Sequence, residues 1–189
     1  MPGEVKAKGV NFVYFKKYVI DNHGDAYWKK LEDSMESSEK DLWEEVLVSG
    51  WYPFSSFKKA FFQYARLQGA QGQSSLPAVY EYIADCSLTT LYKLFFKVAQ
   101  SPHFVLSNYP KLWSMFFDQG QVEALDNKNN QCTIRFVVPE VFLDWLPPAC
   151  VGYTRKAVML SGGRDVVVRE RSRQKDGDLH VVTYFAEWK

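Results

Sequence analysis

The sequence lacks the long apolar segments and the charge imbalance typical of membrane and nucleic-acid-binding proteins. Every apolar run falls short of the roughly 18 consecutive residues that a membrane-spanning helix needs, and we find no signal-peptide pattern. Lys and Arg number 23 against 22 Asp and Glu, so the net charge is only +1. Overall charge therefore predicts no affinity for membranes or nucleic acids, and only a local patch could provide it.

Cysteine is also scarce, with only Cys86, Cys132 and Cys150 in 189 residues. An odd number of thiols at wide spacings does not make a disulfide framework, and no CxxC or Cys-His spacing suggests a zinc site. We expect reduced, buried thiols, no metal and a cytoplasmic protein.

The sequence motifs of common enzyme classes are missing as well. There is no G-x-S-x-G elbow, no glycine-rich phosphate loop and no H-E-x-x-H pair. His23, His103 and His180 come from distant segments, and nothing in the sequence joins them into one site. The chain is therefore predicted to have no catalytic residues and not to be an enzyme.

Aromatic and apolar residues are abundant. Hydrophobic residues make up 47% of the chain and aromatic residues 16%, which is enough to bury a sizeable core. So many large rings in a small protein indicate a thick core, an apolar cavity or an interface.

The first 120 residues have mostly helical periodicity. Apolar residues recur at helical spacing in several segments, and Asn, Gly, Ser and Pro separate those segments. The Gly-rich segment 69–75 is interpreted as a loop. Helices are predicted over 8–23, from Asp25, from Ser37, over 53–67 and over 77–86.

The stretch 88–120 holds two amphipathic segments on either side of Ser101-Pro102. Ser suits the cap position and Pro the first position of the second helix. Gly120 ends the stretch. The apolar stripes consist of Leu91, Leu94, Phe95 and Val98 in the first segment and Tyr109, Leu112, Trp113, Phe116 and Phe117 in the second.

After Gly120 the period changes to that of strands. Two hairpins, the first turning at 126–130 and the second at 174–177, flank a helix over 141–160 that Pro147-Pro148 must interrupt. The predicted fold class is α+β: an N-terminal helical bundle (1–120) packed on a C-terminal antiparallel sheet with a helix, ββαββ (121–189), all in a single domain.

The middle of the chain resembles a family of uncharacterised bacterial domains. That family is similar to a larger group comprising the haem nitric-oxide-binding domains, the vinyl-reductase-type ligand-binding domains and the TRAPP subunits. The resemblance implies a helical part and an α/β part around an apolar pocket, and a homodimer. The matching residues are Leu91, Tyr92, Leu94, Phe95, Ser101, Pro102, Phe104, Val105, Leu106, Pro110, Leu112, Trp113 and Gly120.

The resemblance places the pocket between the helices and the sheet. Its candidate lining residues are mostly aromatic, and the alternative is that they are plain core. The candidates are Trp51, Tyr52, Leu91, Phe95, His103, Trp113 and Phe116.

His103 also raises the question of haem, because the haem nitric-oxide-binding domains ligate iron through a histidine in about this part of the chain. Those domains clamp the haem propionates with Tyr-x-Ser-x-Arg, and the nearest match here, at 153–156, has the wrong spacing and no serine. The vinyl-reductase-type domains carry cysteines in the final hairpin, and none follows Cys150 here. We therefore expect no cofactor, with haem bound through His103 as the alternative.

Basic residues alternate near the C-terminus. If the strand is regular they project from one face, where guanidinium groups could bind a phosphate, a nucleotide or an acidic partner. The alternative is a solvated strand whose charges discourage aggregation. The residues are Arg169, Arg171, Arg173 and Lys175.

Together these observations predict a non-enzymatic sensory or adaptor domain in bacterial signalling, forming a homodimer. It would bind a small hydrophobic ligand, a protein partner or both. One alternative is an interaction module whose own aromatics fill the pocket. The other is a nucleotide or nucleic-acid binder that uses the basic strand, although net charge argues against nucleic acid.

Overall fold

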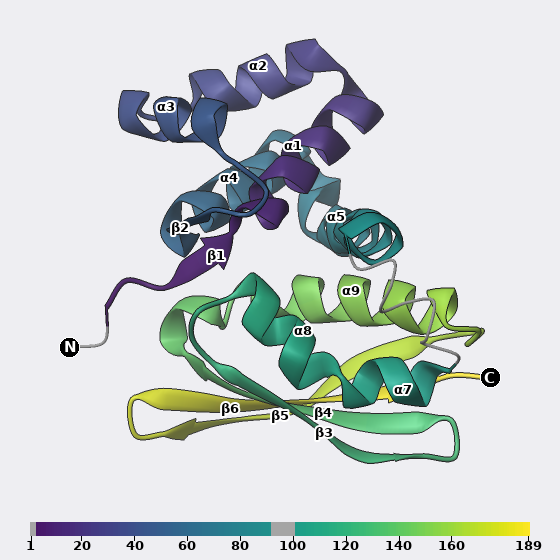
Figure 1. Cartoon of the computed structure of the whole chain (residues 1–189). Coiled ribbons are helices and arrows are strands. Elements are labelled where there is room, and N and C mark those ends of the chain that lie inside the picture. The colour runs from purple at the N-terminus through teal and green to yellow at the C-terminus, as the bar shows by residue number, and fades with distance from the viewer. Residues whose placement is uncertain (1–2, 92–100) are drawn as a thin grey trace.

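The computed structural model describes residues 3–91 and 101–189, and it has two parts (Figure 1). The N-terminal part is a group of helices, and the C-terminal part is a sheet with helices on one face. A continuous buried core runs through both parts. The prediction of an α+β fold with a C-terminal antiparallel sheet is confirmed, whereas the single-domain assignment over 1–189 stays a prediction.

The helical part follows the predicted segments closely and adds a short two-stranded sheet that the periodicity did not indicate. Strands β1 (Lys6–Lys8) and β2 (Trp51–Pro53) pair antiparallel and bring the start of the chain beside the segment that follows the third helix. The helices are α1 (Gly9–His23), α2 (Asp25–Asp33), α3 (Ser37–Glu45), α4 (Phe54–Leu67) and α5 (Gly72–Cys86), with a 3-10 turn η1 (Gly69–Gln71) and a π-helical turn η2 (Ser87–Leu91).

The loop predicted over 69–75 is wrong, because α5 already begins at Gly72 and contains Pro77. Proline removes one helical hydrogen bond. Local side-chain bonds support the turn before it, since the Ser75 hydroxyl donates to the Gly72 carbonyl at 2.8 Å. Leu76, the residue before Pro77, is fully buried. Its burial in the core favours a helical conformation in this turn of α5, although the proline that follows disfavours one.

Two short helices lead from the helical part to the sheet. In α7 (Pro102–Ser107) Ser101 is the N-cap, and its hydroxyl accepts from the Phe104 N–H at 3.3 Å. The predicted Ser-Pro helix start is therefore confirmed. The second amphipathic stripe forms α8 (Tyr109–Phe116), whereas the stripe over 91–98 lies largely outside the described residues.

The C-terminal part is a four-stranded antiparallel sheet in the order β3-β4-β6-β5, joined by one long helix. The first hairpin turns at Asn129-Asn130, where both residues have positive φ, as a tight hairpin turn requires. The elements are β3 (Gln121–Lys128), β4 (Gln131–Pro139), η3 (Glu140–Phe142), α9 (Leu146–Leu160), β5 (Val167–Asp176) and β6 (Leu179–Glu187).

The helix α9 begins at Leu146, and the two prolines that we expected to interrupt the helix lie within its first turn. Proline is compatible with the first helical turn, where its missing N–H would have no partner within the helix. Pro147 and Pro148 therefore start this helix and do not break it.

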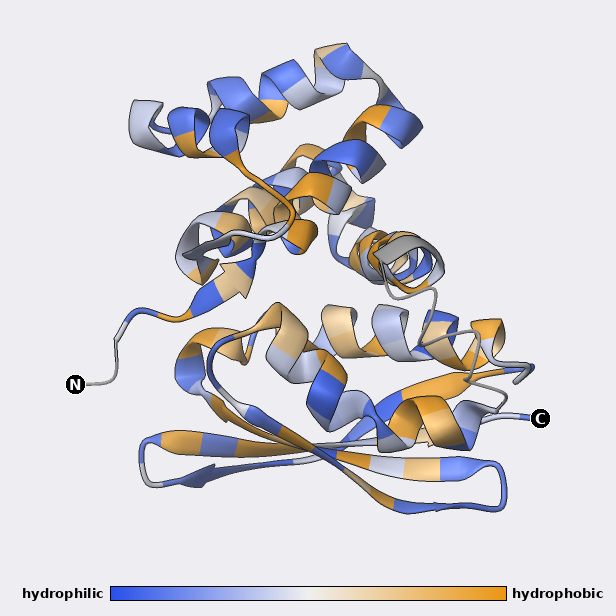
Figure 2. Ribbon diagram, in the orientation of Figure 1, coloured by the Kyte–Doolittle hydropathy of each residue, from blue (hydrophilic) through white to orange (hydrophobic). Residues whose placement is uncertain are grey.

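Helices α7, α8 and α9 cover one face of the sheet, and the helical part lies beyond them (Figure 1). Apolar residues gather where these layers meet, while the hairpin ends and the outer helices are more polar (Figure 2). Among the described residues, no helix is both long and apolar enough to cross a membrane.

Candidate functional site

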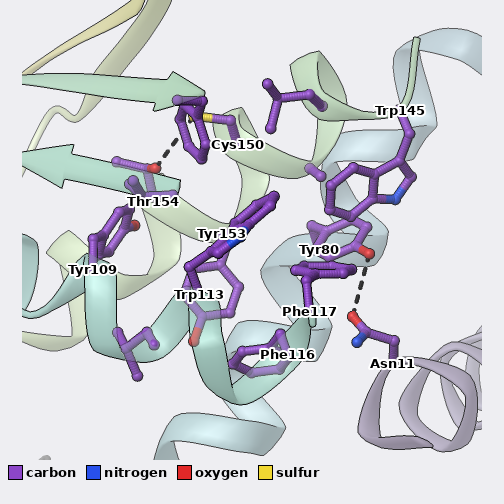
Figure 3. A pocket seen from close by; sticks show the side chains of 15 residues that line it. Asn11, Tyr80, Tyr109, Trp113, Phe116, Phe117, Trp145, Cys150, Tyr153 and Thr154 are labelled. Atoms are coloured by element: carbon purple, nitrogen blue, oxygen red, sulfur yellow. Dashed lines mark hydrogen bonds between the residues drawn. The ribbon is translucent and has the colours of Figure 1, made fainter. Parts of the chain in front are cut away.

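An apolar cavity of about 60 Å³ lies where the helical part meets α8, α9 and the sheet (Figure 3). Its walls come from α1, α5, α8, β3, β4 and α9. The lining residues are Asn11, Tyr80, Tyr109, Leu112, Trp113, Phe116, Phe117, Val122, Phe136, Trp145, Leu146, Ala149, Cys150, Tyr153 and Thr154.

Helix α8 supplies the aromatic wall. The Trp113 ring centroid lies 4.6 Å from that of Phe117 and 5.5 Å from that of Phe136 on the sheet. The Trp113 indole N–H donates to the Gln119 carbonyl at 2.9 Å, which fixes the ring. These contacts make the wall rigid and leave its polar atom satisfied.

The side of the cavity nearest the helical part holds a small polar group. The Tyr80 hydroxyl donates to the Asn11 side-chain oxygen at 3.3 Å, and the Asn11 amide donates to the Lys8 carbonyl at 3.2 Å. Burial raises the pKa of Tyr80 well above its ordinary value, so this hydroxyl stays protonated. The Trp145 ring lies edge-on to Tyr80, with centroids 5.2 Å apart.

A second polar group on α8 and α9 combines a thiol with two hydroxyls. Cys150 Sγ lies 3.8 Å from Thr154 Oγ1, one helical turn further along α9. Burial raises the pKa of Cys150 to about 12 and that of Tyr109 well above its ordinary value. All these groups are neutral at pH 7, and no Asp, Glu, Lys, Arg or His is among the lining residues described. The site therefore favours a neutral guest.

The cavity depends on a close approach of α5 and α9. A Cβ on Gly152 would lie 2.0 Å from the Pro77 carbonyl oxygen and 3.0 Å from Tyr80 Cβ, so only glycine fits there. Beside this contact Arg155 Nη1 and Glu81 Oε1 form an ion pair at 2.6 Å. These two contacts hold the helix pair that closes one side of the cavity.

The predicted pocket residues are distributed over several places. Trp113 and Phe116 line the cavity, and Trp51 and Tyr52 do not. Trp51 is 39% exposed beneath the Lys8 ammonium, and the Tyr52 hydroxyl accepts from the Leu47 N–H at 2.9 Å. Phe95 and the side chain of Leu91 lie outside the described residues.

His103 points away from the cavity, toward the end of the first hairpin and the C-terminal residues. Its Nδ1–H donates to the Asn127 side-chain oxygen at 2.6 Å, and its ring lies 5.0 Å from that of Trp188. The Asn127 amide donates back to the His103 carbonyl at 2.7 Å and to Ser107 Oγ at 2.9 Å. In this structure His103 anchors α7 to β3.

Asn11, Tyr80, Tyr109 and Trp145 line the cavity, although the sequence did not predict them as site residues. The sequence did contain one indication of a site at Asn11, because this polar residue interrupts the apolar run 10–15. The structure shows that its side chain is fully buried. Trp145 lies in a non-periodic segment, so no local pattern identifies it. Only the tertiary arrangement brings these four side chains together.

The predicted single face of basic residues is wrong, because β5 contains a β-bulge at Glu170/Ser172. A bulge adds one residue, so the side chains beyond it point to the other face. Arg169 pairs in register with Phe185, whereas Arg173 pairs with Val182 and Lys175 with His180.

Local partners hold the arginines on both sides of the bulge. Arg171 lies over the Phe185 ring, with 3.8 Å from Cζ to the centroid. Arg169 pairs with Glu187 at 3.5 Å and Arg173 with Glu170 at 2.8 Å. These contacts agree with the solvated-strand alternative better than with a continuous basic ladder.

The shape of the chain places it among mixed helix-and-sheet proteins with an internal apolar cavity. More closely, it has the H-NOX fold. The chain is similar to an Fe(II) unliganded H-NOX protein from K. algicida (14% identity, 96% of each chain, TM-score 0.74). It is also similar to a mutant H-NOX protein from S. oneidensis in the Fe(II) ligation state (13%, 96% of each chain, 0.75) and to an oxygen-binding H-NOX domain related to soluble guanylate cyclases (10%, 96% and 95%, 0.68).

No protein-family model matches the chain, and no curated protein matches it. The structural similarity confirms the resemblance to the haem nitric-oxide-binding group at the level of fold. It contradicts our expectation of no cofactor, because the similar structures include Fe(II) proteins and one described by its haem redox potential and porphyrin distortion. The absence of a clamp motif and of late cysteines is thus not a sound basis for that expectation in this fold.

Proposed function

We propose that this chain is a sensory domain that binds a small, neutral, mostly apolar molecule in the cavity between its helical part and its sheet part. The apolar cavity is the observation that carries the proposal, because its walls come from both parts and include no charged side chain among those described. Similarity to H-NOX sensor structures supports a ligand-binding role over catalysis. Protein partners and a homodimer remain predictions.

The size of the cavity limits its guest. Sites for drug-sized ligands measure about 300–1,000 Å³, and an engineered cavity of about 150 Å³ holds benzene. At about 60 Å³ this cavity accepts only a few heavy atoms unless its walls move.

The described residues do not fit a haem in this cavity. No histidine is among its lining residues, and His103 is bonded to Asn127 and packed on Trp188. The cavity is also far smaller than a typical cofactor site.

The position of the cavity provides a route from binding to signalling. A guest contacts α1 and α5 on one side and α8 and α9 on the other, so it can favour one relative placement of the two parts. Ligand binding shifts conformational populations only through such differential contacts. The Pro77–Gly152 contact and the Arg155–Glu81 pair join the parts at the same place and would respond to that shift.

Xenon binding tests the proposal, because xenon enters apolar cavities and forms no hydrogen bonds. We expect saturable shifts in ¹²⁹Xe and methyl NMR spectra, centred on Leu112, Leu146 and Ala149. Replacing Ala149 with Leu should fill the space and weaken xenon binding at least tenfold. The matched control is Met159→Leu on the exposed side of the same helix, which should bind xenon as the wild type does.

Circular dichroism and urea unfolding would show whether both variants remain folded. Binding of xenon only outside the cavity, or equal binding by the folded Ala149→Leu variant and the wild type, would refute the proposal.

A further inference from the structure

The face of the sheet that points away from α7, α8 and α9, here called the outer face, has exposed apolar side chains. In the part of the chain that the structure describes, no helix lies against this face (Figure 1). Leu125, Val167 and Leu179 project from it and are 41%, 45% and 40% exposed. An antiparallel sheet with one packed face is normally polar on the other, so these side chains indicate a surface that a partner covers.

The alternation of the strands identifies the rest of the outer face. Ile134 and Tyr184 pair in register and are buried on the helix side, so the residues next to them point outward. On the two central strands the outward side chains are more often apolar than charged. They are Thr133, Arg135, Val137 and Pro139 on β4 and Leu179, Val181, Thr183 and Phe185 on β6.

The charged residues of the outer face are largely paired with one another. Arg135 Nη1 lies 2.8 Å from Glu123 Oε2, and Arg169 Nη1 lies 3.5 Å from Glu187 Oε1. The face therefore has no large excess of one sign, and a polyanion such as nucleic acid would gain little from it. Arginine and aromatic residues are also enriched in protein interfaces. These features favour a partner surface that is itself apolar and balanced in charge, as a second copy of the same face is.

The outer face is also large enough for a stable contact. Its four strands have eight to ten residues each. With strands about 4.8 Å apart, they cover roughly 600 Å² before the relief of the side chains is counted. A standard protein interface buries about 800 Å² on each partner. We propose that the outer face is the contact surface between two copies of this chain, which pack sheet on sheet.

The distribution of charge favours a two-fold axis that runs parallel to the strands, between β4 and β6. Such an axis places Val137 over the partner's Val181 and β3 over the partner's β5, with the strands roughly aligned. Glu123 and Ser172 lie in one row of paired residues across the sheet, so the partner's Glu123 lies opposite Ser172 and beside Arg171. No carboxylate among the described residues pairs with Arg171, and this arrangement gives it one.

Sedimentation equilibrium over a wide range of protein concentrations tests the proposal. We expect a reversible dimer with twice the 21.9 kDa mass of one chain. Leu179→Arg puts a charge where an apolar side chain meets the partner, and it should raise the dimer dissociation constant at least about tenfold. Leu47→Arg, at a still more exposed apolar residue of the helical part, is the matched control and should leave this constant unchanged.

A mixture of two variants tests the direction of the axis. Arg171→Glu brings two carboxylates together at each of the two symmetric contacts, and Glu123→Arg brings two guanidinium groups together, so each variant alone should dimerise more weakly. In a heterodimer of the two variants both contacts join opposite charges. The equimolar mixture should therefore associate more tightly than either variant alone. This rescue also shows that both variants are folded.

The possible outcomes decide the proposal without reference to the cavity. A monomer at every concentration, a dimer that Leu179→Arg does not weaken, or equal weakening by Leu47→Arg would overturn it. A mixture that associates no more tightly than its components would overturn the two-fold arrangement. Because the cavity lies on the other side of the sheet, Leu179→Arg should bind xenon as the wild type does, and a failed xenon test would leave this inference standing.

Discussion

The contact between Gly152 on α9 and Pro77 on α5 gives a prediction whose sign depends on the structure. Replacing Gly with Ala inside a helix normally stabilises it by about 1 kcal/mol, because Ala has the higher helix propensity. Helix propensity alone therefore predicts that Gly152→Ala is a stabilising variant. The structure predicts the opposite, because the new Cβ would lie 2.0 Å from the Pro77 carbonyl oxygen.

The size of the effect follows from what would have to move. A carbonyl oxygen inside a helix cannot rotate away as a flexible side chain can, so α5 and α9 must separate. Such overpacking typically costs about 1–3 kcal/mol, and an approach of 2.0 Å to a backbone oxygen belongs to the upper part of that range, about 2–3 kcal/mol, which exceeds the gain in propensity of about 1 kcal/mol. We expect a net loss of roughly 1–2 kcal/mol in the free energy of unfolding. Tyr80 Cβ, 3.0 Å from the same position, would be displaced, and the cavity with it.

Urea unfolding followed by fluorescence and circular dichroism measures this change, and xenon binding reports on the cavity. Met159→Ala, at an exposed position of the same helix, is the control and should change the unfolding free energy by less than about 0.5 kcal/mol. If Gly152→Ala proved as stable as the wild type or more stable, with unaltered xenon binding, α5 and α9 would not approach as described, and our account of the cavity wall would be refuted.

Two further predictions concern thiols and the anchor of α7. Burial raises the pKa of Cys132 and Cys150 to about 12, so Ellman's reagent at pH 8 should modify only Cys86 in the native protein and all three thiols in urea. Because these folded pKa values exceed the ordinary value, the stability that the protonated thiols contribute is complete below about pH 8.5 and is lost as the pH rises toward 12. Between these pH values the unfolding free energy of the wild type should fall by up to ~1.4 kcal/mol more per pH unit than that of Cys150→Ala. An equal fall in the two proteins would contradict the raised pKa of Cys150. Asn127→Ala removes the bonds to His103 and Ser107 and should destabilise the protein by about 1–3 kcal/mol without changing xenon affinity, whereas a large change in affinity would show that His103 does influence the cavity.

Local chemistry was sufficient to predict several elements. Ser101 and Pro102 specify a helix start through bonds within one turn, and α7 begins there. The first hairpin turns at Asn129-Asn130, residues that tolerate positive φ. Alternating apolar residues in β4 place Cys132 and Ile134 on the buried face. In each case the determining interactions lie within a few residues of one another.

The sequence-based prediction failed where tertiary context outweighed local preference. Pro77 lies inside α5 because burial of the apolar residues around it outweighs one lost hydrogen bond. The bulge after Glu170 reverses the side-chain pattern of β5, and no apolar residue follows Glu170 in that strand to reveal the register beyond the bulge. A solvated strand specifies its register weakly, so alternation alone could not place the basic residues.

The candidate site was predictable only in part, for the same reason. Trp113 and Phe116 belong to a helical stripe that the sequence displays, and both line the cavity. Trp145, Tyr109 and Asn11 come from other segments, and their proximity depends on how α8 and α9 pack on the helical part. A buried polar residue within an apolar run, as at Asn11, is the one local signal that could have indicated a site there.

The contacts that form the walls of the cavity also determine which guest molecules it can bind. A guest that does not fit the space of about 60 Å³ requires a wall to move, and at Gly152 α5 and α9 meet through backbone atoms that cannot yield individually. The Arg155–Glu81 pair is partly exposed and adds little by itself, so most of the resistance comes from packing. The cavity therefore discriminates by size through the contact between α5 and α9 and by polarity through a lining that holds no charged side chain among the described residues. Enlarging the guest by one methyl group should cost affinity in the wild type and less in Leu112→Ala, whose shortened side chain widens the α8 wall without altering the contact between α5 and α9.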